Sequence, residues 1–193
     1  MTPAAAKRSA PGVPKAFRID RKAPLGRHAL LDVFPGLDGL ETAHRQVPDR
    51  TARQRLYGST KVEIVDGDVW MYVAPHVIPS WARARWKPVD SGGVDCIVIG
   101  EEHLRESEAL ILYLDIFHEL CHVLQRKAGR ELFPEGISYV ERSTEVDAYQ
   151  FVVDEARRFG IADAVIREYL KVEWISEEEF GRLLDALGVP RTG

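Results

Sequence analysis

The sequence has few cysteines, no long apolar segment and no excess of positive charge. Its 193 residues include only Cys96 and Cys121. Two cysteines are too few for a disulfide framework, so we expect a reducing, cytoplasmic setting. No apolar run is long enough and free enough of charge to span a bilayer, and no signal-peptide pattern follows the N-terminus. The formal net charge of −4 gives no general attraction to nucleic acid or to membranes.

The remaining composition is that of an ordinary globular protein, with 45% hydrophobic and 29% charged residues. Residues 1–26 are rich in Ala, Pro, Lys and Arg and contain few large apolar residues. We expect this segment to be a disordered basic tail, either a solubilising leader or a contact arm for an acidic partner. Residues 27–193 then form a single domain with room for a sizeable core.

Strand patterns lie in the first half of this domain. Lys61–Val73 has two apolar alternating runs around Asp66-Gly67, the turn pair typical of a two-residue β-hairpin. Val94–Ile99 reads as a short buried strand that ends at Gly100. If this strand lies at the edge of a sheet, it could pair with an extended peptide.

Two other segments have no settled role. Residues 28–57 are too short and too broken by turn residues for the two well-formed helices of a helix-turn-helix. Trp81–Lys87 combines tryptophans with arginines and lysine. It fits tryptophans packed under a loop with solvated arginines, or a surface that binds an acidic segment or single-stranded nucleic acid.

Ile111–Gln125 predicts the central helix of the fold, because it lacks Gly and Pro, is rich in Leu and precedes a plausible stop at Gly129. Nearly all of it is apolar, which indicates a helix buried on most sides. At about 100° per residue, its polar residues other than Tyr113 share one narrow face. These residues are Asp115, His118, Glu119, His122 and Gln125. A polar face inside a core requires partners, because unpaired buried polar groups are costly.

This face contains an H-E-x-x-H motif, His118 to His122. Residues four apart on a helix lie one above the other, so both imidazoles can reach one metal ion. Glu119 lies beside them, where it can act on a water molecule rather than bind the metal. Two histidines satisfied by core hydrogen bonds remain the alternative. Cys121, inside the motif, is more typical of a small core residue than of a ligand.

A second helix is expected over residues 138–159, opened by a capping box of Ser138 and Glu141 and ended by Gly160. Its apolar spacing places Glu145 on the inward face. If the two helices form an antiparallel pair, Glu145 comes level with His122 and completes a His-His-Glu set with a fourth position open, the usual arrangement of catalytic zinc. A salt bridge is the alternative role for Glu145. Asp147 is the rival ligand but points elsewhere on the helix.

Two further helices are expected at the C-terminus, over residues 161–173 and from a Ser176 cap to Gly188. Their acidic residues read as a solvated face, and no chemistry is assigned to them.

The chain resembles the gluzincin metallopeptidases, and among them the small intracellular ImmA/IrrE-type group. That group carries HExxH on one helix and a pattern close to E-x-E-A-N-x-F-A on the next. Here Glu145, Ala148 and Phe151 match that pattern, Asp147 matches in kind, and Tyr149 departs from it. The resemblance covers roughly residues 95–159.

This resemblance implies an α+β fold, a minimal zincin-like domain. In it a small twisted sheet packs on the buried HExxH helix, followed by the Glu-bearing helix and C-terminal helices. It also implies a zinc ion held by His118, His122 and Glu145, with Glu119 as the base. The expected activity is zinc-dependent hydrolysis of a peptide bond in a protein or peptide substrate. Family members often act on a repressor, so the resemblance implies a regulatory protein as one such substrate. The alternative is a non-catalytic zincin scaffold that binds a regulator or ligand.

Peptide hydrolysis needs further residues around such a metal. Asp115, on the same polar face, is expected to orient a ligand imidazole, and Asp147 is a second candidate for such support. A donor must also stabilise the oxyanion. The candidates for this donor are Tyr149, Tyr139 and His103.

Overall fold

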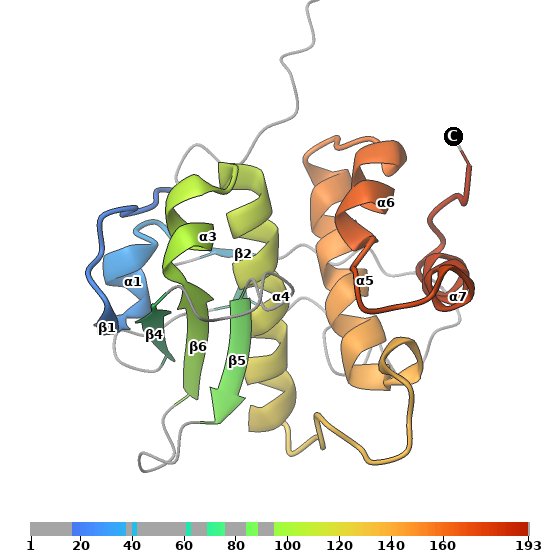
Figure 1. Ribbon diagram of the computed structural model, residues 1–193, viewed down its shortest axis with the longest axis horizontal. Helices are drawn as coiled ribbons and strands as arrows, with labels where there is room; N and C mark the ends of the chain where they lie inside the picture. Colours follow the sequence, from blue (N-terminus) through green and yellow to red (C-terminus); the bar gives the residue numbers. More distant parts are fainter. Residues whose placement is uncertain are drawn as a thin grey trace, which may run out of the picture.

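The computed structural model describes residues 17–37, 40–41, 61–62, 69–75, 84–88 and 95–192. These residues form an α+β fold, as predicted (Figure 1). A four-stranded mixed sheet lies on one side of a long central helix, and a group of helices lies on the other side. The central helix is therefore covered by the sheet and by the helical group.

The main sheet has the strand order β1-β4-β6-β5. Its strands are β1 (Gly26–Ala29), β4 (Val69–Ala74), β5 (Ala84–Pro88) and β6 (Asp95–Gly100). The central pair, β4 and β6, is parallel, and each outer strand is antiparallel to its neighbour. A separate two-stranded sheet joins β2 (Leu40–Glu41) to β3 (Lys61–Val62).

Two strand predictions differ from this topology. The hairpin expected over Lys61–Val73 is wrong, because β4 pairs with β1 on one side and β6 on the other, while β3 pairs with β2. The Asp66-Gly67 pair itself lies outside the described residues. The strand expected at Val94–Ile99 is present as β6, but it is interior and so has no free edge for a peptide.

One face of the sheet supplies the core. Along β4, Met71 and Val73 are fully buried, whereas Tyr72 between them is exposed. Ile97 and Ile99 of the neighbouring strand are also fully buried. This period-2 pattern is expected of a sheet with one face covered. Each such buried side chain contributes about 1.5–3 kcal/mol relative to exposure, so this face anchors the sheet beneath the helices.

The described helices follow the sheet strands in sequence, except for a short one near the N-terminus. They are α1 (Leu30–Val33), α3 (Glu101–Glu106), α4 (Ala109–Lys127), α5 (Ser143–Arg158), α6 (Asp163–Leu170) and α7 (Glu177–Leu187), with a 3-10 turn η1 at Tyr139–Glu141. None of these helices is both long and apolar enough to cross a membrane.

The predicted central helix is confirmed as α4. It ends where Gly129 adopts a left-handed φ of 76°, a conformation that glycine takes at little cost. Most of its apolar residues are buried, and so are His118, Glu119, His122 and Gln125 of its polar face. It packs against β5 and β6 on one side and against α5 on the other. The polar face of α4 therefore has to find its partners inside the protein.

The start of the second helix differs from the prediction. Ser138 and Glu141 do not form a capping box; residues 139–141 make the 3-10 turn, and α5 begins at Ser143 after an Arg142 N-cap without a side-chain cap. By contrast, the capping box at Ser176 and Glu179 and the left-handed stop at Gly188 are confirmed for α7. The helix predicted over residues 161–173 is the shorter α6.

The packed part of the chain begins before residue 27. Phe17 stacks on Phe34, with ring centroids 5.8 Å apart, and meets the ring of Tyr113 edge-on. Ala23 is buried. Residues 17–26 thus lie against the domain, whereas residues 1–16 of the expected tail lie outside the described part. Of Trp81–Lys87, only the backbone of residues 84–87 within β5 is described.

Candidate metal centre

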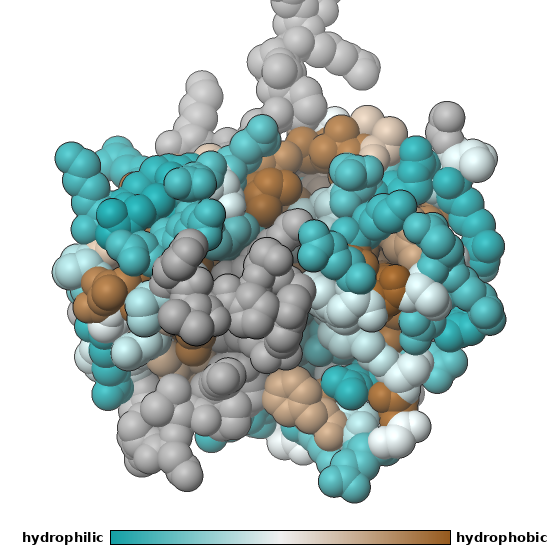
Figure 2. Space-filling view, viewed as in Figure 1, coloured by the Kyte–Doolittle hydropathy of each residue, from teal (hydrophilic) through white to brown (hydrophobic). Residues whose placement is uncertain are grey.

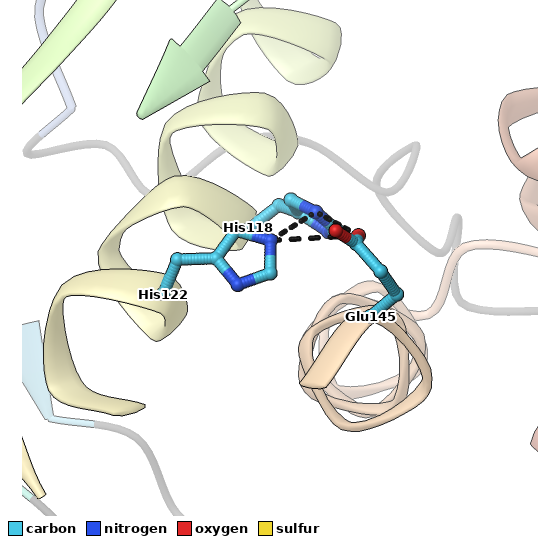
Figure 3. Close-up of side chains that lie close together, drawn as sticks. All are labelled: His118, His122 and Glu145. Atoms are coloured by element: carbon cyan, nitrogen blue, oxygen red, sulfur yellow. Dashed lines mark hydrogen bonds and ion pairs between the residues drawn. The ribbon is translucent and has the colours of Figure 1, made fainter. Parts of the chain in front are cut away.

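Three buried side chains from two helices meet between α4 and α5. His118 and His122 come from α4, and Glu145 comes from the first turn of α5 (Figure 3). The Nε2 atoms of the two imidazoles lie 3.1 Å apart. Glu145 Oε2 lies 3.4 Å from Nε2 of His118 and 3.5 Å from Nε2 of His122. The helix pair thus brings together the His-His-Glu set that the sequence predicts.

The triangle formed by these three atoms has the dimensions of a metal site. Zinc binds imidazole nitrogen and carboxylate oxygen at about 2.0–2.2 Å, which gives a tetrahedron with edges of about 3.3–3.6 Å. The three observed edges are 3.1, 3.4 and 3.5 Å. One cation at the centre of such a set would contact all three atoms. The three residues can therefore hold a metal ion.

Hydrogen bonding fixes which nitrogen of His122 faces this point. Gln125 donates its amide to the carbonyl of Thr144, at 2.7 Å, so its Oε1 faces His122. Nδ1 of His122 donates to that oxygen at 2.8 Å. The Nε2 lone pair of the neutral ring is therefore directed at Glu145 and His118, as metal binding requires.

The carboxylate of Glu145 is buried and ionised, which favours a cation beside it. Its Oε2 has no hydrogen-bond partner in the described part of the chain. Burial by itself disfavours the charged form, but the adjacent His118 and His122 imidazoles outweigh it and hold the pKa of Glu145 well below its ordinary range. A buried carboxylate that stays ionised needs positive charge beside it, which a metal ion would also supply.

The same electrostatics act on His122. Burial disfavours its charged form, but the carboxylates of Glu145 and Glu119 raise the pKa of His122 to about 9. Without a metal, this histidine is protonated at neutral pH and pairs with Glu145. A divalent cation would displace that proton, since only a neutral imidazole can coordinate it.

Glu119 adjoins the three candidate ligands without belonging to their triangle. Its side chain is buried. Its charge contributes to the raised pKa of His122 and of the tyrosines Tyr139 and Tyr149. The charge of Glu119 is therefore felt at the His-His-Glu set and at the two tyrosines beside it.

Two of the three oxyanion candidates also border the site. The rings of Tyr149 and His118 are in contact, with centroids 4.5 Å apart. The hydroxyl groups of Tyr149 and Tyr139 are hydrogen-bonded at 2.9 Å. Burial, first of all, raises the pKa of both phenols, so they stay protonated and remain donors at neutral pH. One hydroxyl donates to the other, which leaves one proton of the pair for a third atom.

Three other predicted residues have partners elsewhere. Asp115 accepts hydrogen bonds from His103, at 2.7 Å, and from Tyr169, at 2.9 Å, so both its oxygens are engaged away from the ligand imidazoles. His103 uses both ring nitrogens, on Asp115 and on Ser107. Asp147 pairs with Arg130 at 2.7 Å. None of these four contacts involves a member of the His-His-Glu set.

The supporting role that the sequence assigned to Asp115 falls to Gln125 instead. Gln125 lies on the same polar face of α4 and is fully buried. Its position on that face was visible in the sequence, but its partner Thr144 lies 19 residues further on. Only the packing of α5 on α4 selects Gln125 over Asp115.

Comparison with protein-family models, with curated proteins and with solved structures finds no match. What the structure defines is therefore a buried two-histidine, one-glutamate cluster that can hold a metal ion.

Proposed function

We propose that the protein is a zinc-dependent peptidase of the HExxH gluzincin type, built on a minimal zincin-like domain. The observation that carries the proposal is the triangle of His118, His122 and Glu145, with Glu119 beside it on α4. A purely structural zinc site has four protein ligands and no need of a buried carboxylate next to it. Three ligands and an adjacent base are the arrangement of a hydrolytic site.

Zinc is the ion that this donor set favours. Two imidazoles and one carboxylate at near-tetrahedral spacing are typical of catalytic zinc, whereas calcium and magnesium prefer more oxygen ligands. When bound, the ion supplies Lewis-acid chemistry at a substrate carbonyl. The remaining work falls to side chains of this chain.

Glu119 is assigned the proton transfers. It takes a proton from the attacking water and gives it to the amine that leaves when the peptide bond breaks. Its burial beside other charged groups keeps it away from bulk solvent. This placement favours direct transfer between the carboxylate and the reacting atoms.

The Tyr139–Tyr149 pair is assigned the oxyanion. The pair has one hydroxyl proton available beyond the bond that joins its members. Tyr149 also packs on His118, which ties the pair to the metal ligands. His103 is a weaker candidate, because both of its ring nitrogens are already bonded.

An extended peptide is the substrate form that the sheet favours. In the described sheet β5 is an outer strand, and it packs against α4, the helix of the HExxH motif. Its outer edge can add a substrate strand through backbone hydrogen bonds. Pairing with an extended peptide, which the sequence analysis considered for β6, is therefore assigned to β5.

Metal analysis combined with cleavage profiling tests the proposal. After loosely bound metal is removed, we expect close to one zinc per chain, and His122→Ala should abolish it. Incubation with a peptide library should give cleavage products that a chelator suppresses. Glu119→Gln should retain zinc but lose hydrolysis by a factor of at least about 10².

Glu168→Gln is a matched control, because this glutamate is exposed on α6 away from the cluster. It should retain both zinc and cleavage. Zinc binding without any cleavage by the wild-type chain would favour the non-catalytic binding module. Full cleavage by Glu119→Gln would remove this residue as the base.

A further inference from the structure

His103 and Asp115, which the candidate metal centre does not use, belong to a separate hydrogen-bond network. We call it the Ser107 network, and its members are Ser107, His103, Asp115 and Tyr169. Oγ of Ser107 lies 2.5 Å from Nδ1 of His103. Nε2 of the same imidazole lies 2.7 Å from Oδ2 of Asp115. The other oxygen of Asp115 accepts from the hydroxyl of Tyr169 at 2.9 Å. Four residues on α3, α4, α6 and the α3–α4 junction are thus linked in series.

The positions of the protons in the Ser107 network follow from the Asp115 carboxylate. The carboxylate of Asp115 can only accept, so Nε2 of His103 carries a hydrogen and donates it. In the neutral ring Nδ1 is then an acceptor, and the hydroxyl of Ser107 donates to it. This is the proton arrangement of a serine nucleophile, a histidine base and an orienting aspartate. In serine peptidases Nε2 faces the serine and Nδ1 faces the aspartate, whereas here Nδ1 faces Ser107 and Nε2 faces Asp115. The serine still donates to the ring and the aspartate still accepts from it.

Each member of the Ser107 network has a position that suits nucleophilic catalysis. Ser107 is half-buried, so part of this residue is open to solvent. His103 and Asp115 are mostly buried, with side chains 13% and 11% exposed, which limits competition from water. Tyr169 holds the second oxygen of Asp115, so the carboxylate cannot turn away from the imidazole. His103, held in this way, keeps the lone pair of its Nδ1 directed at the hydroxyl of Ser107.

The same junction offers donors for a developing negative charge. Ser107 is the residue before Glu108, the N-cap of the 19-residue helix α4, and no side chain caps that end. The first N–H groups of a helix have no partner within it, and the helix dipole adds positive potential there. An oxyanion formed at Ser107 would lie at this end of α4.

We propose that Ser107 is the nucleophile of a second, metal-independent acyl-transfer site, with His103 as its base and Asp115 as the residue that orients the base. In the reaction, Oγ forms a bond to an ester carbonyl carbon while its proton passes to Nδ1 of His103. The carbon–oxygen bond to the alcohol breaks, and that proton leaves on the alcohol. Water then hydrolyses the acyl-serine and restores the hydroxyl.

Charged groups of both signs lie around Ser107, since Arg21 donates to the backbone carbonyls of Leu104 and Arg105. Glu102 and Glu106 on α3 and Glu108 at the junction are exposed, and Arg105 is already paired with Glu101. Figure 2 shows hydrophilic side chains gathered over α3. Because carboxylates and a guanidinium both border the junction, charge does not select among esters, and an uncharged substrate is the appropriate test.

An uncharged fluorophosphonate probe tests the site in the full-length, metal-loaded protein. Attack by Ser107 forms an oxygen–phosphorus bond and expels fluoride, so intact mass and peptide mapping should show one adduct, at Ser107. Ser107→Ala should give no adduct, whereas the exposed Ser143→Ala, a matched control, should be labelled at the wild-type rate. His103→Gln should slow labelling by about 10²-fold, the usual contribution of a general base. Because labelling does not depend on peptide hydrolysis, failure of the metal centre leaves this result interpretable.

A Ser107→Cys variant keeps the test valid if His103→Gln fails to fold. Cys96 and Cys121 are buried, so the introduced thiol is the accessible one in the described chain. A histidine and a helix N-terminus lower a thiol pKa, so iodoacetamide at pH 7 should react about tenfold faster than with an unperturbed thiol. Absence of a Ser107 adduct, an unchanged rate in folded His103→Gln, or ordinary thiol reactivity in Ser107→Cys would each overturn the proposal.

Discussion

Nδ1 of His122 donates a 2.8 Å hydrogen bond to Oε1 of Gln125, three residues later on α4. The amide of Gln125 in turn donates to the backbone carbonyl of Thr144, next to Glu145. One side chain thus orients a candidate ligand on α4 and connects it to the segment of α5 that carries the third ligand. Residues that hold a ligand imidazole in this way commonly contribute 10–100-fold to metal affinity.

Gln125→Leu is therefore predicted to weaken zinc binding by about 10–100-fold while leaving all three ligands in place. Leucine has a similar size but can neither accept from His122 nor donate to Thr144. Competition with a chromophoric chelator would measure the affinity. Leu124→Ala, an adjacent half-buried position outside the polar face, serves as a control and should keep zinc affinity. Wild-type affinity in Gln125→Leu would show that the ring of His122 is held by other contacts.

Zinc binding is predicted to release protons in a defined pH window. The neighbouring carboxylates raise the pKa of His122 to about 9 from an ordinary value of 6.5, so the metal-free protein holds this proton at neutral pH. Coordination requires the neutral ring. Between about pH 6.5 and 9, calorimetry in buffers of different ionisation enthalpy should show about one proton released per zinc, and affinity should rise with pH.

The same pKa shifts predict how the stability of the metal-free protein depends on pH. The raised pKa of His122 contributes stability that is complete below about 6.5 and is lost as the pH rises through about 9. The lowered pKa of Glu145 contributes stability that is present above about 4.5 and is lost at more acidic pH. The Tm of the metal-free protein should therefore fall from pH 6.5 to 9. If the Tm of the metal-free protein rises over this pH range instead, the proposed ion pair between His122 and Glu145 is contradicted.

The candidate metal ligands were predictable because local periodicity determines their placement. His118, His122 and Glu119 share a face of any helix that contains them, and Glu145 lies on the inward stripe of its own helix. The partners of Asp115 and His103 were not predictable in this way. Tyr169 lies 54 residues from Asp115 in the sequence. Such long-range choices depend on how α3 and α6 pack, which no local pattern encodes.

The fold shows the same division between local and distant signals. The capping box of Ser176 and Glu179 and the stop at Gly188 depend on neighbouring residues and were predicted correctly. The Asp66-Gly67 pair favoured a hairpin by its turn chemistry. Residues 69–74 are instead shared between β1 and the parallel strand β6, whose pairing buries Val73 and Ile99 in register. The partners of β4 are thus determined by the pairing that buries an apolar face, which no local turn signal encodes.

Tyr113 and Glu155 form a buried contact that is predicted to matter for stability rather than function. The hydroxyl of Tyr113 donates to Oε1 of Glu155 at 2.6 Å, and Arg158 donates to both carboxylate oxygens. Tyr113→Phe removes one donor to a buried carboxylate and should cost about 1–3 kcal/mol of unfolding free energy. Urea denaturation would measure the loss. Zinc content should stay unchanged, since Tyr113 lies on the far side of α4 from the His-His-Glu set.

The tyrosine pair gives the sharpest test of the proposed hydrolysis, because its two members should not be equivalent. Tyr149 packs on His118, whereas Tyr139 packs on Trp174, with centroids 5.9 Å apart. Removal of an oxyanion donor costs about 10²–10³ in kcat. We expect a loss of this size, with zinc content and KM largely unchanged, for the Tyr→Phe variant whose hydroxyl contacts the substrate.

Steady-state kinetics on a cleaved peptide would separate the two tyrosines. If Tyr149 is the direct donor, Tyr149→Phe should lose about 10²–10³ in kcat, while Tyr139→Phe, which removes only the partner of that donor, should lose about tenfold or less. The reverse order would make Tyr139 the direct donor. Equal and small effects in both variants would mean that neither hydroxyl contacts the oxyanion.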